Sequence, residues 1–290
     1  MNMNYEMEVS LGGLYIRLKS EVPLSVRSGT GAFLVQTENA DVTVQVRVME
    51  DNVALPPESC GEDLLLIYYR DGRYCYAAAK KGTKDSAAVT VYTPDFSETV
   101  FYINEKEFPG MIRTVDKILQ LFPIRQLFAI HQIIMLHSSR VVINGKTLVF
   151  TAPSQTGKTT QAGLWKQYEK AEIVSNDRTL LRKMGNGFVT FGYPVDGSSP
   201  VCDNRRLPLG AVIVLRQGED NQVVRLPALK ALKHLMEQTV ADLWNAEEKT
   251  AIQLLWMDLL EQYPVYLLTC RPDRGAVSCL KNQLMKDGVI

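Results

Sequence analysis

Short apolar runs, several with strict hydrophobic–polar alternation, recur through the first third of the chain. A period of two is typical of strands that bury one face. Such runs lie at residues 14–18, 41–48, 64–69, 73–77, 89–93 and 100–104. Asp71-Gly72 separates the third run from the fourth, and this dipeptide favours a β-hairpin. We therefore predict a β-rich N-terminal domain over residues 1–109, with a recognition or scaffolding role.

The periodicity changes to helical spacing in residues 111–136. Apolar residues recur three and four positions apart from Met111 onward, and Ile133 and Ile134 continue the same pattern. Pro123 breaks or restarts the helix, because proline lacks the N–H that a helix interior needs. We predict a helical connector over residues 110–136.

A third pattern, of short apolar runs between amphipathic stretches, begins at residue 137. Asn144-Gly145 joins two apolar runs and predicts a type I′ hairpin. Residues 209–215 (L-G-A-V-I-V-L) are continuously apolar and predict a buried central strand. Further strands are expected at 173–174, 188–191 and 265–268, and helices at 159–170, 226–238, 247–262 and 276–285. The fold class is α+β or α/β, and residues 137–290 form a mixed sheet with flanking helices.

The second apolar run of this hairpin leads into V-F-T-A-P-S-Q-T-G-K-T-T, residues 149–160. Strand, compact turn and Gly-Lys-Thr at a helix start match the phosphate-binding template G-x-x-x-x-G-K-S/T, with alanine at the first glycine. Backbone N–H groups and the Lys158 ammonium would hold the phosphates of ATP, and the Thr159 hydroxyl would ligate Mg2+. The predicted nucleotide-binding residues are Ala152, Pro153, Ser154, Gln155, Thr156, Gly157, Lys158, Thr159 and Thr160. The alternative is a chance Gly-Lys-Thr at a helix start.

Asp177 and His137 are candidate catalytic residues together with Lys158. Asp177 ends the Ile173–Val174 strand, where an acid can ligate Mg2+, accept a proton from a hydroxyl, or do both. The alternative is a carboxylate that caps a turn. His137 starts the hairpin that leads to the phosphate turn, so its imidazole can meet the terminal phosphate or the acceptor. A purely structural histidine is the alternative.

Several other charged residues are weaker candidates. Arginines can neutralise phosphate charge in a transition state, and open α/β sheets place ligand contacts after the strand ends. Surface ion pairs and turn formation account for them equally well. These residues are Arg178, Arg205, Arg206, Asp196, Arg271, Asp273 and Arg274.

Composition and charge restrict the partners and the compartment. The 290 residues are 46% hydrophobic and 22% charged with a net charge of zero, so we expect a globular protein without a basic field for nucleic acid. No apolar run is long enough to span a membrane, and the N-terminus lacks the pattern of a signal peptide. Five scattered cysteines without a C-x-x-C favour reduced thiols and a cytoplasmic location.

Taken together, His137, the turn and Asp177 make residues 131–275 resemble the C-terminal domain of HPr kinase/phosphorylase, which shares its nucleotide core with the ATP-dependent phosphoenolpyruvate carboxykinases. The chain looks most like the HPr-kinase-related proteins found beside peptide-modification gene clusters. The family loop G-x-S-G-x-G-K-S/T falls on residues 152–159, and the family's acidic pair falls on Asn176-Asp177. Related kinases assemble, so the resemblance also suggests a homo-oligomer.

The resemblance implies a Mg2+-assisted, ATP-dependent kinase that acts on a Ser or Thr hydroxyl of a small protein or peptide. Ala152 and Gln155 replace loop glycines, and Asn176 replaces one acid of the pair. These replacements favour the alternative of a catalytically inactive nucleotide-binding module that recognises a peptide or protein partner. A third alternative is a kinase of a small hydroxyl metabolite.

Overall fold

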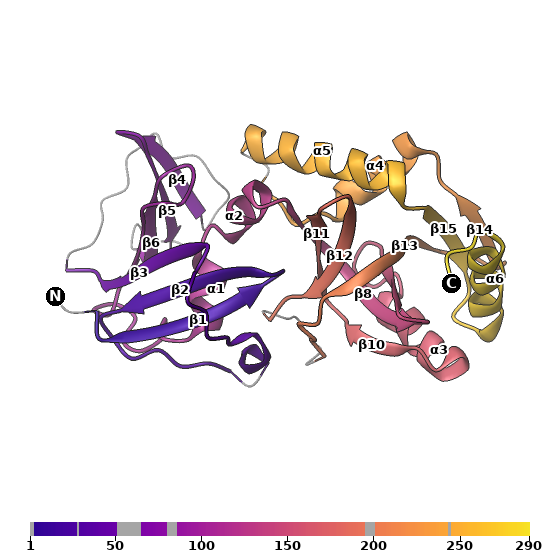
Figure 1. The fold of residues 1–290 in the computed structure, drawn as a ribbon, viewed down its shortest axis with the longest axis horizontal. Coiled ribbons are helices and arrows are strands. Elements are labelled where there is room, and N and C mark those ends of the chain that lie inside the picture. The colour runs from indigo at the N-terminus through magenta and orange to yellow at the C-terminus, as the bar shows by residue number, and fades with distance from the viewer. Residues whose placement is uncertain (1–2, 28, 51–64, 80–85, 195–200, 243–244) are drawn as a thin grey trace. The chain divides into compact units, whose positions relative to one another are not determined.

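The computed structural model describes residues 3–27, 29–50, 65–79, 86–194, 201–242 and 245–290 (Figure 1). The chain divides into two compact units, Met1–Ile130 and His131–Ile290. Each unit is built on one mixed sheet with few helices, so the α+β fold class is confirmed. None of the helices in the described ranges combines the length and the apolar character needed to cross a membrane.

The first unit contains a seven-stranded sheet with the order β1-β2-β3-β7-β6-β5-β4. Strands β2, β3 and β7 pair in parallel, and the other pairs are antiparallel. The predicted Asp71-Gly72 turn joins β4 to β5, and both residues have positive φ (51° and 78°), as a type I′ turn requires. The strands are β1 (Tyr5–Leu11), β2 (Leu14–Ser20), β3 (Val42–Val48), β4 (Leu65–Arg70), β5 (Arg73–Ala79), β6 (Ser86–Tyr92) and β7 (Thr99–Ile103), with a short 3-10 helix η1 (Thr30–Phe33).

Two short helices, α1 (Val115–Leu121) and α2 (Ile124–Ile130), belong to the first unit. The break between them falls at Pro123, as predicted. Gln126 of α2 accepts a hydrogen bond from the Tyr92 hydroxyl of β6 (2.6 Å), which ties this helix to the sheet. The prediction that the helix continues through Ile133 and Ile134 is wrong, because these residues begin strand β8. Both side chains are fully buried there, and burial on a sheet overrides their helical spacing.

The second unit contains an eight-stranded sheet with the order β10-β8-β11-β12-β13-β15-β14, and β9 pairs with β8 and β13. The predicted central strand, residues 209–215, lies within β13 and pairs in parallel with both β9 and β15. Asn144 and Gly145 (φ 50° and 74°) form the predicted turn between β8 and β9. The strands are β8 (Ile133–Ile143), β9 (Lys146–Thr151), β10 (Glu172–Ser175), β11 (Arg178–Met184), β12 (Gly187–Gly192), β13 (Leu207–Gln217), β14 (Gln222–Arg225) and β15 (Val265–Cys270).

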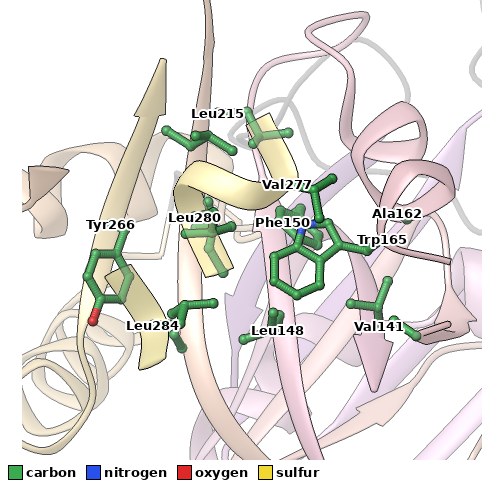
Figure 2. Close-up of a cluster of buried hydrophobic side chains, with 14 of the residues drawn as sticks. Val141, Leu148, Phe150, Ala162, Trp165, Leu215, Tyr266, Val277, Leu280 and Leu284 are labelled. Atoms are coloured by element: carbon green, nitrogen blue, oxygen red, sulfur yellow. The ribbon is translucent and has the colours of Figure 1, made fainter. Parts of the chain in front are cut away.

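Four helices cover this sheet: α3 (Lys158–Glu169), α4 (Ala228–Gln238), α5 (Ala246–Gln262) and α6 (Arg274–Lys286). Helices α3 and α6 pack together on one hydrophobic cluster, which also contains side chains of β8, β9, β13 and β15 (Figure 2). The ring centroids of Trp165 and Phe150 lie 6.2 Å apart, and both side chains are fully buried. This contact joins the strand before the Lys158 turn to the helix after it.

We expect Trp165→Ala to destabilise the second unit by about 3–5 kcal/mol, since it removes a fully buried aromatic side chain from this cluster. Gln167→Ala is the matched control, because Gln167 is exposed on the same helix and such changes stay within about 0.5 kcal/mol. Urea unfolding of both variants measures the difference. Equal midpoints for the two variants would show that Trp165 does not anchor α3.

Candidate functional site

The β9–α3 loop, residues 152–157, joins the C-terminal end of a buried strand to the first turn of α3. Its tip, residues 153–155, is exposed. Gln155 and Gly157 have positive φ angles of 63° and 112°. The Gln155 conformation is one that glycine adopts without cost and that other residues adopt at about 1–2 kcal/mol. The loop therefore keeps a glycine-like backbone at position 155 although glutamine occupies it.

The two ends of the loop are fixed by different contacts. Ala152 is fully buried and belongs to the hydrophobic cluster with Trp165, so its methyl group packs where the template has glycine. At the other end, Lys158 is only 7% exposed and its Nζ donates to the carbonyl oxygens of Ala152 (2.8 Å) and Pro153 (3.2 Å). The lysine thus folds back over the loop, and two backbone carbonyl groups of the loop hold its ammonium.

The first turn of α3 has no side-chain cap. Gly157 is the N-cap residue, no described side chain accepts a capping hydrogen bond from the N–H groups there, and the first turn contains no acidic residue. In α6, by contrast, the Asp273 carboxylate accepts from Ala276 N (3.0 Å). Uncapped N–H groups at a helix N-terminus attract anions, because they carry the positive end of the helix dipole. A lysine directly at this terminus increases the positive potential.

Strand pairing brings His137 and Asp177 together. His137 lies in the middle of β8, and its register partner on β11 is Arg178. The turn between β10 and β11 is attached to β8, because Ser138 N donates to the Asp177 carbonyl (3.0 Å). As a result, His137 Nε2 is 3.7 Å from Asp177 Oδ1, and Arg178 Nε is 3.6 Å from Asp177 Oδ2. Thr151 of β9 donates to the His137 carbonyl (2.8 Å), so this pair is also tied to the strand that leads into the loop.

Burial and neighbouring charges shift the pKa values of His137 and Lys158. Burial lowers the pKa of His137, the positive charges of Lys158 and Arg178 lower it further, and Asp177 opposes them. Burial also lowers the pKa of Lys158, and Asp177 again acts in the opposite direction. Together these effects favour the neutral form of the His137 imidazole. Asp177 is the carboxylate that favours the charged form of both cations.

A magnesium ion would find oxygen ligands here, but few of them from the protein. Among the described residues, no group of three or more His, Cys, Asp or Glu side chains is arranged to hold a metal. Thr159 is exposed in the first turn of α3, and the Asp177 carboxylate is partly exposed. One hydroxyl and one carboxylate suit Mg2+, which keeps several waters and binds through substrate phosphates. The two residues therefore fit this ion only together with a bound nucleotide.

Two cavities adjoin the loop. One, of about 400 Å3, lies between the loop residues Ala152 and Pro153 and the C-terminal part of α4, which contributes His234 and Glu237. The other, of about 350 Å3, lies beside the first turn of α3 and the C-terminal ends of β13 and β15. Thr156, Leu215 and Gln217 line both cavities, so the two cavities adjoin each other at the loop.

The weaker candidates from the sequence are distributed differently. Arg178 joins the His137–Asp177 pair, whereas Arg205 forms ion pairs with Glu172 and Asp203. Asp273 caps α6, and Arg271 lines the 350 Å3 cavity. Asp196 lies outside the described residues.

Two buried polar residues of the second unit were not anticipated from the sequence. Arg140 of β8 is completely buried, and it donates to Thr190 Oγ1 (3.1 Å) and to the Asp203 carbonyl (2.8 Å). Burial lowers the pKa of its guanidinium to about 10. Gln161 of α3 lines the 350 Å3 cavity. Neither residue stands in a motif, and only its burial distinguishes it.

The fold and site define a two-unit α+β protein with a lysine-bearing loop at an uncapped helix N-terminus and a histidine–aspartate pair in the same unit. The chain belongs to the family described as SynChlorMet cassette protein ScmC, whose model matches residues 105–271. No curated protein matches it in sequence. Among solved structures, it is similar to the Hpr(Ser) kinase/phosphatase from Coxiella burnetii, with 12% identity and a TM-score of 0.33 over 53% of this chain and 98% of the other. This likeness is distant.

We expect Gln155→Gly to stabilise the second unit, because it removes the cost of a positive φ angle at a non-glycine residue. A gain of about 1 kcal/mol corresponds to a rise in Tm of about 2–4 °C for a unit of this size. Gln155→Ala is the control, since alanine has the same backbone restriction and should leave Tm unchanged. A melting scan that shows no gain for glycine over alanine would contradict the strained conformation.

His137 should make stability depend on pH. Its pKa is lower in the folded protein than the ordinary 6.5, so below about pH 6.5 the unfolded chain binds a proton that the folded protein does not. Stability should therefore fall as the pH drops through this window. His137→Gln should show a smaller fall, measured by urea unfolding at several pH values. An equal or steeper fall in the variant would show that His137 does not carry this effect.

Proposed function

We propose that this protein is an ATP-dependent kinase that transfers the γ-phosphate to a Ser or Thr hydroxyl of a small protein or peptide. The observation that carries the proposal is the position of Lys158 and the uncapped α3 N-terminus beside the His137–Asp177 pair. An anion-binding loop alone is compatible with many nucleotide-binding proteins. A neutral imidazole and a carboxylate next to it supply the proton acceptor that transfer to a hydroxyl needs.

The loop and Lys158 would bind the phosphates. N–H groups of the β9–α3 loop and the first turn of α3 donate to phosphate oxygens, and Lys158 exchanges its two carbonyl partners for an oxygen of the terminal phosphates. This exchange replaces hydrogen bonds to neutral carbonyls with charge-assisted ones, which are about twice as strong. The same groups hold the charge that develops on the transferred phosphoryl group.

Thr159 and Asp177 would hold Mg2+, which would neutralise phosphate charge. Asp177 Oδ1 faces His137 Nε2, so one of these two groups can orient the acceptor hydroxyl and take its proton. The hydroxyl oxygen forms a bond to the γ-phosphorus, the bond from the γ-phosphorus to the bridging oxygen breaks, and ADP leaves with that oxygen. Most of the rate enhancement comes from positioning and charge stabilisation.

The alternative is a nucleotide-binding module without catalytic activity, and one observation favours it. Asn176 stands next to Asp177, so the carboxylate that would ligate Mg2+ is also the only one at this turn that could act as base. His137 resolves the conflict in the kinase proposal, because the neutral imidazole accepts the proton while Asp177 serves the metal. We place the reaction in the cytoplasm, where ATP is abundant.

Two substitutions separate the kinase from the inactive module. Lys158→Met should weaken binding of Mg-ATP by about 10- to 100-fold, because it removes one charge-assisted hydrogen bond. Asp177→Asn should still bind ATP but transfer phosphate at least about 100-fold more slowly. Calorimetry measures the binding, and mass spectrometry of a Ser/Thr peptide library incubated with labelled ATP measures the transfer.

Lys166→Met is the matched control for the lysine, since Lys166 is exposed on the same helix. ATP binding without transfer in the wild-type protein would favour the inactive module. Unchanged binding in Lys158→Met would refute the phosphate site itself.

A further inference from the structure

We infer that the 350 Å3 cavity beside α3 holds the base of the nucleotide and that Gln161 selects adenine there. The inference rests on the proposed nucleotide site. The cavity and the proposed phosphate site share the first turn of α3, because Gly157 and Thr160 line the cavity and Lys158 lies between them in the chain, with its Nζ on the loop carbonyls. A nucleotide held by its phosphates at the loop therefore has this cavity within reach of its base.

The composition of the wall suits a neutral aromatic ring. Leu215 and Pro272 are apolar residues in the lining, and Gln155, Gln161 and Gln217 are neutral amides. Among the described residues that line the cavity, Arg271 is the one charged residue. Such a wall offers apolar contact to the faces of a base and hydrogen bonds to its edge. It has little to offer a second anion or a metal ion.

Among the described residues that line the cavity, Gln161 has a buried polar atom without a hydrogen-bond partner. Its side chain is 2% exposed, and its Nε2 donates to Cys270 Sγ (3.2 Å). Its Oε1 has no hydrogen-bond partner among the described residues. A buried polar atom without a partner destabilises the folded protein. A ligand that brings a hydrogen-bond donor to this wall removes that destabilisation.

Adenine and guanine differ in whether the substituent at C6 donates or accepts a hydrogen bond. The edge of adenine carries an amino group at C6, which donates, whereas guanine and hypoxanthine carry an oxygen there, which accepts. With Nε2 engaged by Cys270, Gln161 presents an acceptor. It therefore pairs with adenine and leaves two acceptors facing each other when the base is hypoxanthine or guanine.

The inference is tested by calorimetric titration with Mg-ATP and Mg-ITP, because the two bases differ at the C6 substituent. The wild-type protein should bind ATP about tenfold more tightly than ITP. Gln161→Met should bring the two affinities within about twofold. Gln167→Met, on an exposed position of the same helix, should keep the wild-type preference.

A second measurement needs no substitution. Cys270 lines the cavity, so bound ATP should slow its alkylation by iodoacetamide several-fold, as followed by peptide mass spectrometry. Cys279, on α6, does not line the cavity and should react at the same rate with and without ATP.

The possible failures are distinguishable. A wild-type protein that binds neither nucleotide would overturn the proposed function and this inference together. If the wild-type protein binds ATP and the Lys158→Met variant does not, the proposed nucleotide site is supported. In that protein, equal affinity for ATP and ITP, an unchanged preference in Gln161→Met, or unprotected Cys270 would each overturn the inference alone.

Discussion

The contact between Phe150 on β9 and Trp165 on α3 is the constraint on which the candidate site depends. It fixes the strand that ends at the β9–α3 loop and the helix that begins there, so the six-residue loop must close a set distance. Ala152 is buried in the same cluster and leaves little freedom at the start of the loop. Packing at both ends of the loop allows Gln155 to keep a positive φ angle. The packing free energy offsets the conformational cost of this angle at a residue other than glycine.

The candidate site also depends on the long strand β8, whose two halves pair with different strands of the sheet. Its first half pairs with β11, and its second half pairs with β9 and β10. His137 lies where these pairings meet, so the β10–β11 turn with Asp177 comes to the loop side of the sheet. Lys158 lies near enough to this pair to act on the pKa of His137. Phosphate binding and proton acceptance would thus be coupled through charge as well as through position, and a bound phosphate would counter the effect of Lys158 on His137.

Much of the second unit could be predicted from local patterns. Asn144-Gly145 favours one turn type whatever surrounds it, and the apolar run 209–215 is too continuous for a strand with a solvent-facing side. The prediction failed at Ile133 and Ile134, and the strand β11 was not anticipated. In both places the local sequence is ambiguous between helix and strand. Pairing between β8 and β11 decides the structure there, and this pairing between distant segments cannot be predicted from the local pattern of a single sequence.

The sequence by itself predicted a strand, a compact turn and a helix start around Gly157, because the apolar run before this residue and the helical pattern after it are local signals. Only the tertiary structure decided that His137, Asp177 and Lys158 interact, since their proximity depends on the register between strands distant in the chain. It also decided the incomplete hydrogen bonding of Gln161 and the burial of Arg140, because a glutamine in a helix and an arginine in a strand carry no local signal. Hydrogen bonding and desolvation of a side chain are properties of its surroundings, and the surroundings exist only once the chain has folded.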